Sequence, residues 1–241
     1  MNSDINCNNA FYQDLDTNFK LACKMSEKSF THDELIYMLK NGNIPEKQFS
    51  ALNFDYVKNT EDAYALLNNL TGCDGKIREA VAFRINSILI NDTMSRKIFS
   101  EISAKTFADA TIDINANICR LIVDSAELLI NYNNFSIEYT NRIVDYANEA
   151  LNELDKFIFK DKKYTINKQL FKLYWSLEAL IKFNHFVDDK ILKDILERSS
   201  SQSEYTIREK TAQILVNSSK FDDIKEKLIN DENYYVKQIL H

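Results

Sequence analysis

Residues 74–81 read DGKIREAV, and residues 204–211 read EYTIREKT. The two stretches share an isoleucine, an arginine and a glutamate at the same three positions. Related stretches begin at residue 163 (KYTINKQL) and at residue 233 (NYYVKQIL). Self-similarity at intervals of a few tens of residues is the signature of a repeat protein, and we therefore look for the structural unit that each copy begins.

Each copy begins an amphipathic helix. In the first copy, Ile77, Val81 and Ile85 are spaced at i, i+4 and i+8, which places them on one apolar stripe. Weaker copies near Ile44 and Ile114 extend the series. The apolar residues that anchor the six copies are then Ile44, Ile77, Ile114, Ile166, Ile207 and Val236.

A second helix is expected before each of these. Thr31 and Glu34 have the spacing of a capping box at a helix start, and Gly42 is a stop signal. Pro45 suits the first turn of the helix that follows. The remaining partner helices are expected within residues 60–70, 92–103, 136–159, 187–198 and 221–230.

Composition supports an all-α fold. The chain of 241 residues contains three glycines and one proline, whereas sheet proteins need many tight turns rich in both. A helical hairpin of about 35–40 residues cannot bury its apolar stripe alone, but stacked hairpins share one continuous core. The sequence therefore predicts an α-solenoid of about six stacked helical hairpins.

In several copies, the first turn of the second helix contains an isoleucine or valine followed by an arginine or lysine. This motif resembles the HEAT repeat, including its phycobilisome-lyase-like short form. The resemblance covers residues 30–241, with residues 1–29 as a capping helix region. It implies a right-handed superhelix. It also implies that Asp74, Arg78 and Arg208 belong to a ladder of polar contacts between repeats; a solvated first turn or a ligand contact are the alternatives for the arginines.

Side chains that could carry chemistry are scattered. The three histidines (His32, His185 and His241) fall in different repeats, and no H-E-x-x-H or cysteine–histidine cluster supplies the spacing of metal ligands. The chain also lacks a P-loop, a G-x-S-x-G elbow and a G-x-G-x-x-G loop. We expect no metal, no cofactor and no enzymatic activity.

One basic helix face is the candidate for binding a partner. Lys168, Lys172 and Trp175 are spaced at i, i+4 and i+7 and share one side of a helix, with Lys182 two turns further on. Such a face could hold an acidic peptide or a nucleic-acid backbone, with the indole as an anchor.

Trp175 also has a second interpretation. The corresponding positions in two other repeats are Val123 and Val216, and apolar residues at one repeat position indicate packing against the neighbouring hairpin. Tryptophan side chains are usually mostly buried. The sequence leaves both a core position and an exposed position open.

The charge balance favours a protein partner. The chain contains 30 Lys and Arg residues and 36 Asp and Glu residues, which gives a net charge of −6. Proteins that bind nucleic acid usually carry an excess of basic residues. The polar, acidic start resembles no secretion signal, and no apolar run approaches the ~20 residues of a membrane span, so we expect a cytoplasmic chain. The leading hypothesis is a non-catalytic scaffold that binds a protein or peptide on the concave face of the solenoid. The alternative is a nucleic-acid-binding protein such as a DNA-alkylation-repair-type glycosylase.

Overall fold

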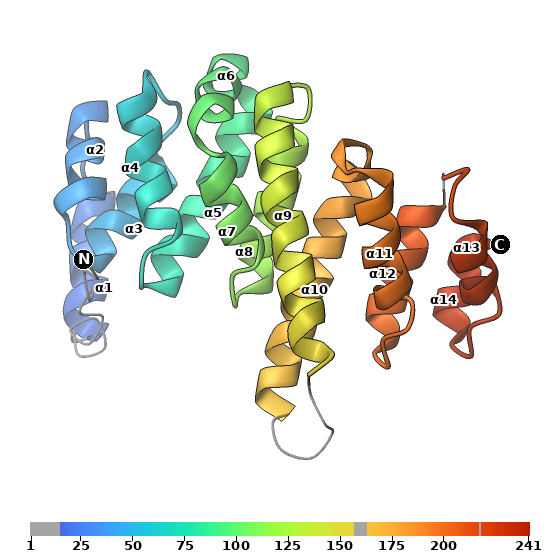
Figure 1. Cartoon of the computed structure of the whole chain (residues 1–241). Helices are drawn as coiled ribbons and strands as arrows, with labels where there is room; N and C mark the ends of the chain where they lie inside the picture. Colours follow the sequence, from blue (N-terminus) through green and yellow to red (C-terminus); the bar gives the residue numbers. More distant parts are fainter. Residues whose placement is uncertain (1–14, 157–162, 217) are drawn as a thin grey trace. The chain divides into compact units, whose positions relative to one another are not determined.

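The computed structural model describes residues 15–156, 163–216 and 218–241 (Figure 1). Within these residues the chain forms fourteen α-helices and one short 3-10 helix, and no strand. The all-α fold expected from the sequence is confirmed. None of the described helices combines the length and the apolar character that a bilayer crossing requires.

The chain divides into two compact units, Met1–Leu129 and Ile130–His241. The described part of unit 1 holds eight helices: α1 (Leu15–Ser26), α2 (His32–Asn41), α3 (Ile44–Asn53), α4 (Thr60–Leu70), α5 (Gly75–Asn91), α6 (Thr93–Ile102), α7 (Ala104–Thr111) and α8 (Ala116–Glu127). Unit 2 holds α9 (Asn133–Leu154), α10 (Lys163–Phe183), η2 (Asn184–Phe186), α11 (Asp189–Ser199), α12 (Tyr205–Leu215), α13 (Asp222–Ile229) and α14 (Tyr234–Leu240).

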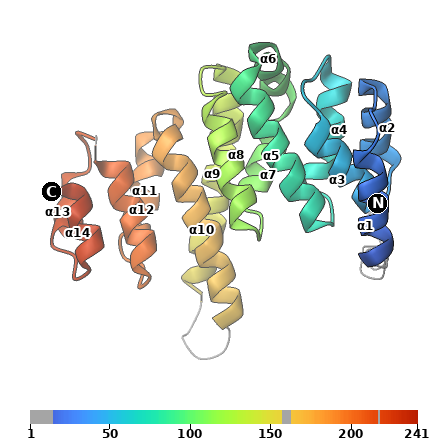
Figure 2. The ribbon, with the colours of Figure 1, turned by 180° about the vertical axis from the view of Figure 1, so that it is seen from behind.

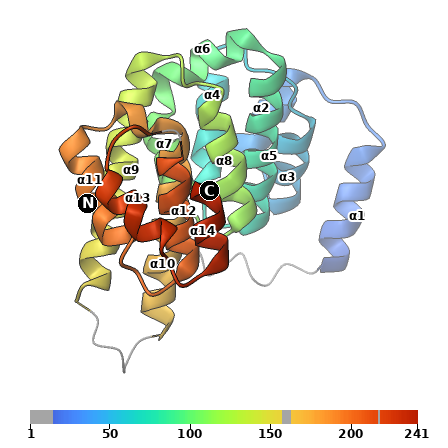
Figure 3. The same cartoon turned by 90° about the vertical axis from the view of Figure 1, so that its right-hand side faces the viewer.

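Unit 1 is a stack of three helical hairpins. Helices α2 and α3 form the first, α4 and α5 the second, and α6, α7 and α8 the third. The second helices lie side by side in the order α3, α5, α8, as Figure 2 shows, and the first helices form the other layer. Helix α1 packs against α3 and lies to one side of it (Figure 3), within the region expected to cap the repeats; residues 1–14 of that region lie outside the described residues.

Unit 2 repeats the same construction. Its hairpins are α9 with α10, α11 with α12, and α13 with α14. The second helices again lie in sequence order, α10 against α12 and α12 against α14. Each unit is therefore a short stack of hairpins, as the repeats predict.

Local capping explains where the helices begin. Thr31 and Glu34 form the expected capping box at α2, and Asn43 with Glu46 forms another at α3, where Pro45 occupies the first turn. These side chains satisfy backbone N–H groups that have no partner inside the helix.

The helix expected at residues 92–103 is present as α6, and a further helix that the sequence did not predict, α7, follows it after a break at the buried Ser103. The expected start of the third repeat was wrong. Asn115 caps α8, Ile114 is 83% exposed outside the helix, and the buried anchor is Ile118, four residues later. The anchors Ile77, Ile207 and Val236 are buried as expected.

Candidate functional site

The repeated arginines bind the next hairpin. The guanidinium of Arg78 at the start of α5 donates from Nε and Nη2 to the two carboxylate oxygens of Asp113, at 2.7 and 3.3 Å. Its Nη1 donates to the backbone carbonyls of Gly72 and Cys73 in its own loop. Asp113 lies in the turn before α8, so this contact ties the second and third hairpins of unit 1 together.

Arg208 makes the same set of bonds in unit 2. Its Nε and Nη2 donate to Asp231 at 2.6 and 2.9 Å, and its Nη1 donates to the carbonyls of Gln202 and Ser203. The side chains of Arg208 and Asp231 are only 9% and 8% exposed. Hydrogen bonding to Asp231 raises the pKa of Arg208, and the same bonds lower the pKa of Asp231.

Asp74 has a different role from the two arginines. Its carboxylate Oδ1 accepts the backbone N–H groups of Lys76 and Ile77, both at 2.9 Å, and so caps α5. The acidic partners of the arginines are Asp113 and Asp231, which sequence reasoning did not pair with them. Both precede an asparagine cap in the pattern Asp-x-Asn, and that shared pattern is the signal that could have identified them.

The tryptophan of the basic face proposed on α10 is not exposed to a partner. Trp175 is 7% exposed, and its indole packs edge-on against Phe171 and Tyr174. Of the two positions that the sequence left open, the structure has the buried one. The ring is therefore not available as an anchor for a partner.

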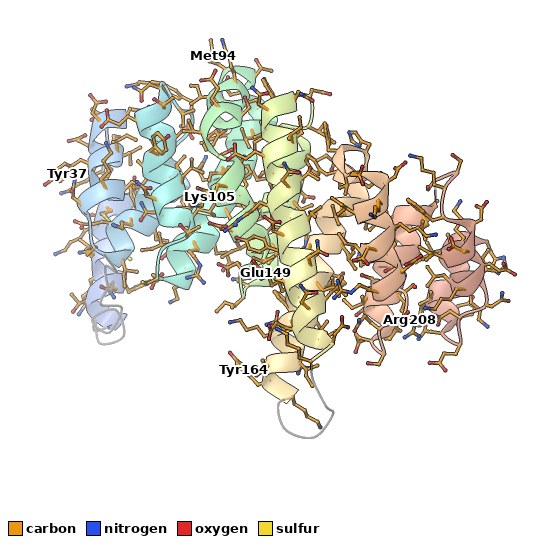
Figure 4. The ribbon with its side chains drawn as sticks, viewed as in Figure 1. Tyr37, Met94, Lys105, Glu149, Tyr164 and Arg208 are labelled. Carbon is orange, nitrogen blue, oxygen red and sulfur yellow. The ribbon has the colours of Figure 1, made fainter. Side chains whose placement is uncertain are left out.

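The lysines of that face are placed differently from one another. Lys172 pairs with Glu149 of α9, which Figure 4 labels, and its ammonium lies 4.6 Å from the centre of the Tyr146 ring. Lys168 is exposed, whereas Lys182 is half-buried and has contacts of its own. The four residues are thus not gathered into one open basic surface.

One of the three histidines, His32, lies close to an acidic side chain. His32 Nε2 lies 2.8 Å from Asp62 Oδ2, and the imidazole stacks on the Tyr56 ring and makes a tilted contact with the Phe54 ring. Asp62 also accepts the backbone N–H of Lys58, so the pair joins α2 to α4 and the loop between the hairpins. In the part of the chain that the structure describes, no three His, Cys, Asp or Glu side chains come together as a metal site.

The exposed side of α3, α5 and α8, which we call the second-helix face of unit 1, contains an open groove of about 390 Å³. The groove crosses all three hairpins of the unit, and its lining is mostly apolar. It is lined by Gln48 and Leu52 from α3, by Lys76, Glu79, Ala80 and Phe83 from α5, and by Asn117 and Leu121 from α8.

Phe83 is the central apolar side chain of this groove. It is 52% exposed, with Leu52 on one flanking helix and Leu121 on the other. Other large apolar side chains on the surface of unit 1, such as Tyr37 and Met94 (Figure 4), do not line the groove. Single exposed apolar residues are common, but a group of them in one groove is typical of a binding surface.

Unit 2 has a larger but more polar hollow of about 490 Å³ near the ends of α10 and α12. Lys220 and Asp189, which both line it, pair with each other at 2.6 Å. Because Lys220 and Asp189 pair with each other, they are less available to a partner, and the groove of unit 1 is the better candidate for a binding site.

Sequence reasoning missed Phe83. The stripe of Ile77, Val81 and Ile85 identified the buried side of α5, and Phe83 falls on the opposite side of the helix. A large aromatic residue on the polar side of an amphipathic helix is the signal that could have found the groove.

The chain is similar in fold to a solved structure. No protein-family model matches the chain, and no curated protein matches it. Among solved structures, an archaeal HEAT-like repeats protein from Thermococcus onnurineus NA1 aligns with 88% of this chain and 78% of its own, at 13% identity and a TM-score of 0.48. Within the residues that the structure describes, the chain is built of repeated helical hairpins, and it resembles this HEAT-like repeats protein in fold.

Proposed function

We propose that this chain is a non-catalytic scaffold that binds a peptide segment of a protein partner on the second-helix face of unit 1. The observation that carries the proposal is the groove around Phe83, which residues of three successive hairpins line and in which the apolar side chains of Leu52 and Phe83 are exposed. Stacked repeats commonly present such extended surfaces to a partner.

The shape of the groove favours a peptide. It is open along one side and spans three helices, so a chain can lie across it while one bulky side chain enters between Leu52, Phe83 and Leu121. Binding of this kind relies on a central apolar contact surrounded by polar groups. Gln48, Glu79 and Asn117 supply the polar groups here.

The contribution of Phe83 follows from its exposure. Complete burial of a phenylalanine side chain is worth about 1.5–3 kcal/mol, and half of this ring remains to be covered. A partner that covers it gains about 0.8–1.5 kcal/mol, so removal of the ring should weaken binding by about four- to twelvefold.

The test is selection from a random 12-residue peptide library on the purified chain, followed by fluorescence anisotropy of the selected peptides. Phe83→Ser should weaken binding, while Tyr37→Ser, which removes an exposed aromatic ring from α2, should not. Failure of the wild-type chain to enrich any peptide, or equal binding by Phe83→Ser, would overturn the proposal.

A further inference from the structure

Two exposed cations lie at the groove, Lys76 in its lining and Arg120 beside the lining residue Asn117. Lys76, which lines it, is exposed, and its ammonium has no acidic side chain within 4.0 Å among the described residues. Arg120 on α8 is also exposed; its one described side-chain bond is from Nη2 to Oδ1 of the groove residue Asn117, at 3.5 Å. Both cations are therefore available to a ligand.

One carboxylate, that of Glu79, also lines the groove. It accepts a hydrogen bond from the Asn117 amide at 2.9 Å, which fixes the position of the carboxylate but leaves its charge in place. The groove thus combines an apolar wall with two cations, Lys76 and Arg120, and one carboxylate.

This local charge differs from that of the whole molecule. The chain has a net charge of −6, which repels acidic partners at long range. Salt screens that repulsion beyond about 8–10 Å, whereas a carboxylate seated in the groove would lie within a few ångströms of Lys76 or Arg120. Local complementarity therefore decides which peptide is retained.

We infer that the groove selects acidic peptides, in which a bulky apolar residue is flanked within a few positions by Asp or Glu. The inference rests on the proposed function and specifies the partner of the same site. The apolar side chain contacts Phe83, Leu52 and Leu121, and the flanking carboxylates pair with Lys76 and Arg120.

The probes are three pools of 12-residue peptides with a fixed central leucine or phenylalanine. Their flanking positions are drawn from acidic and small residues, from neutral polar residues, or from basic and small residues. We expect the acidic pool to be enriched on the wild-type chain. Binding of its members should weaken as salt is raised, because exposed ion pairs are screened.

The variant that tests the charge is the double reversal Lys76→Glu/Arg120→Glu, which should bind acidic peptides at least about tenfold more weakly. Lys105→Glu is the matched control: it reverses an exposed lysine of α7, in the layer of first helices (Figure 4), and should bind as the wild type does. The neutral pair Lys76→Gln/Arg120→Gln should fall between the two. Circular dichroism checks that each variant is folded.

The outcomes separate this inference from the proposed function. Enrichment of neutral or basic peptides, or equal binding by the double reversal, overturns the acidic specificity; if that binding still depends on Phe83, the scaffold proposal stands. No enrichment from any pool overturns both. Binding of a labelled 20-base-pair DNA duplex is measured as well. If the wild-type chain binds DNA but no acidic peptide, and the double reversal abolishes the binding of DNA, the cations bind nucleic acid and the inference is overturned.

Discussion

Replacement of Arg208 by methionine should destabilise unit 2 strongly. Methionine keeps much of the aliphatic stem but removes the guanidinium, which donates two hydrogen bonds to Asp231 and two to backbone carbonyls of its own loop. The Asp231 carboxylate would remain buried without its cation. Removing one partner of a buried ion pair typically costs about 3–5 kcal/mol, a large part of the ~5–15 kcal/mol that stabilises a whole domain.

Urea unfolding measures this loss directly. Trp175 is the only tryptophan of the chain, it is buried in α10, and α10 packs against α12, which carries Arg208. Its fluorescence therefore reports the unfolding of unit 2. The midpoint and slope of the transition give the free energy of unfolding for the wild type and for Arg208→Met.

Two further variants make the result specific. Arg198→Met removes a partly exposed guanidinium that binds Asp155 and Asn152, and it should cost less than about 1 kcal/mol. Asp231→Asn, alone and combined with Arg208→Met, completes a double-mutant cycle with an expected coupling of about 0.5–3 kcal/mol. If Arg208→Met costs no more than Arg198→Met, or if the cycle gives no coupling, the ladder does not hold the hairpins together.

Three other predictions concern Asp231, Cys119 and Ile207. Because hydrogen bonds from Arg208 lower the pKa of Asp231, the stabilisation from the pair should be complete above the unfolded aspartate value of about 3.9 and be lost as the pH falls through the folded value. Urea titrations at decreasing pH should therefore show the difference between wild type and Arg208→Met shrinking. Burial, and then the nearby Asp113 charge, raises the pKa of Cys119 to about 12, so iodoacetamide should label the exposed Cys23 and leave Cys119 unmodified in the native chain, as peptide mass spectrometry would show. Ile207→Ala should cost about 2–5 kcal/mol as a truncation of a buried side chain, measured by the same urea unfolding.

Helix starts were predictable because their causes are local. The two partners of the capping box, Thr31 and Glu34, are three positions apart, and both are visible in one short stretch of sequence. The same holds for the buried isoleucines Ile77 and Ile207, whose register follows from the stripe on their own helix. Local interactions of this kind determine where each hairpin begins.

The register of the third repeat shows the limit of periodicity. Ile114, Ile118 and Ile122 all satisfy the spacing of four, so the stripe alone cannot say which of them is the first helical residue to be buried. The cap decides it: the Asn115 side chain accepts the N–H of Asn117, and the helix begins after it. An apolar stripe identifies a helix face, but a cap is needed to fix its start.

The ladder partners could not be found from spacing. Asp113 lies 35 residues after Arg78, whereas Asp231 lies 23 residues after Arg208, because the intervening hairpins differ in length. The resemblance to the HEAT repeat placed Asp74 in the ladder, but Asp74 caps its own helix instead. Contacts between repeats depend on the stacking of hairpins, which the sequence specifies only indirectly.

The binding face was hard to predict for a related reason. Helical periodicity placed Lys168, Lys172 and Trp175 on one side of α10, but it does not say what covers that side. Glu149 and Tyr146, which contact Lys172, come from the neighbouring helix α9. A helix face is a surface only where no other element packs on it.

The side chain of the fourth residue of a second helix can make two separate contacts, one with the turn before its own helix and one with the next hairpin. In α5, α8 and α12 this residue is Arg78, Cys119 and Arg208, and each donates a hydrogen bond to the carbonyl six residues earlier. The thiol satisfies the carbonyl of its own turn, as the arginines do, but it is too short to reach a following hairpin. Only the arginines also bind an aspartate there, Asp113 within unit 1 and Asp231 within unit 2. The repeated turn therefore needs only a donor at this position, and an arginine in that place adds a bond between successive hairpins of the same unit.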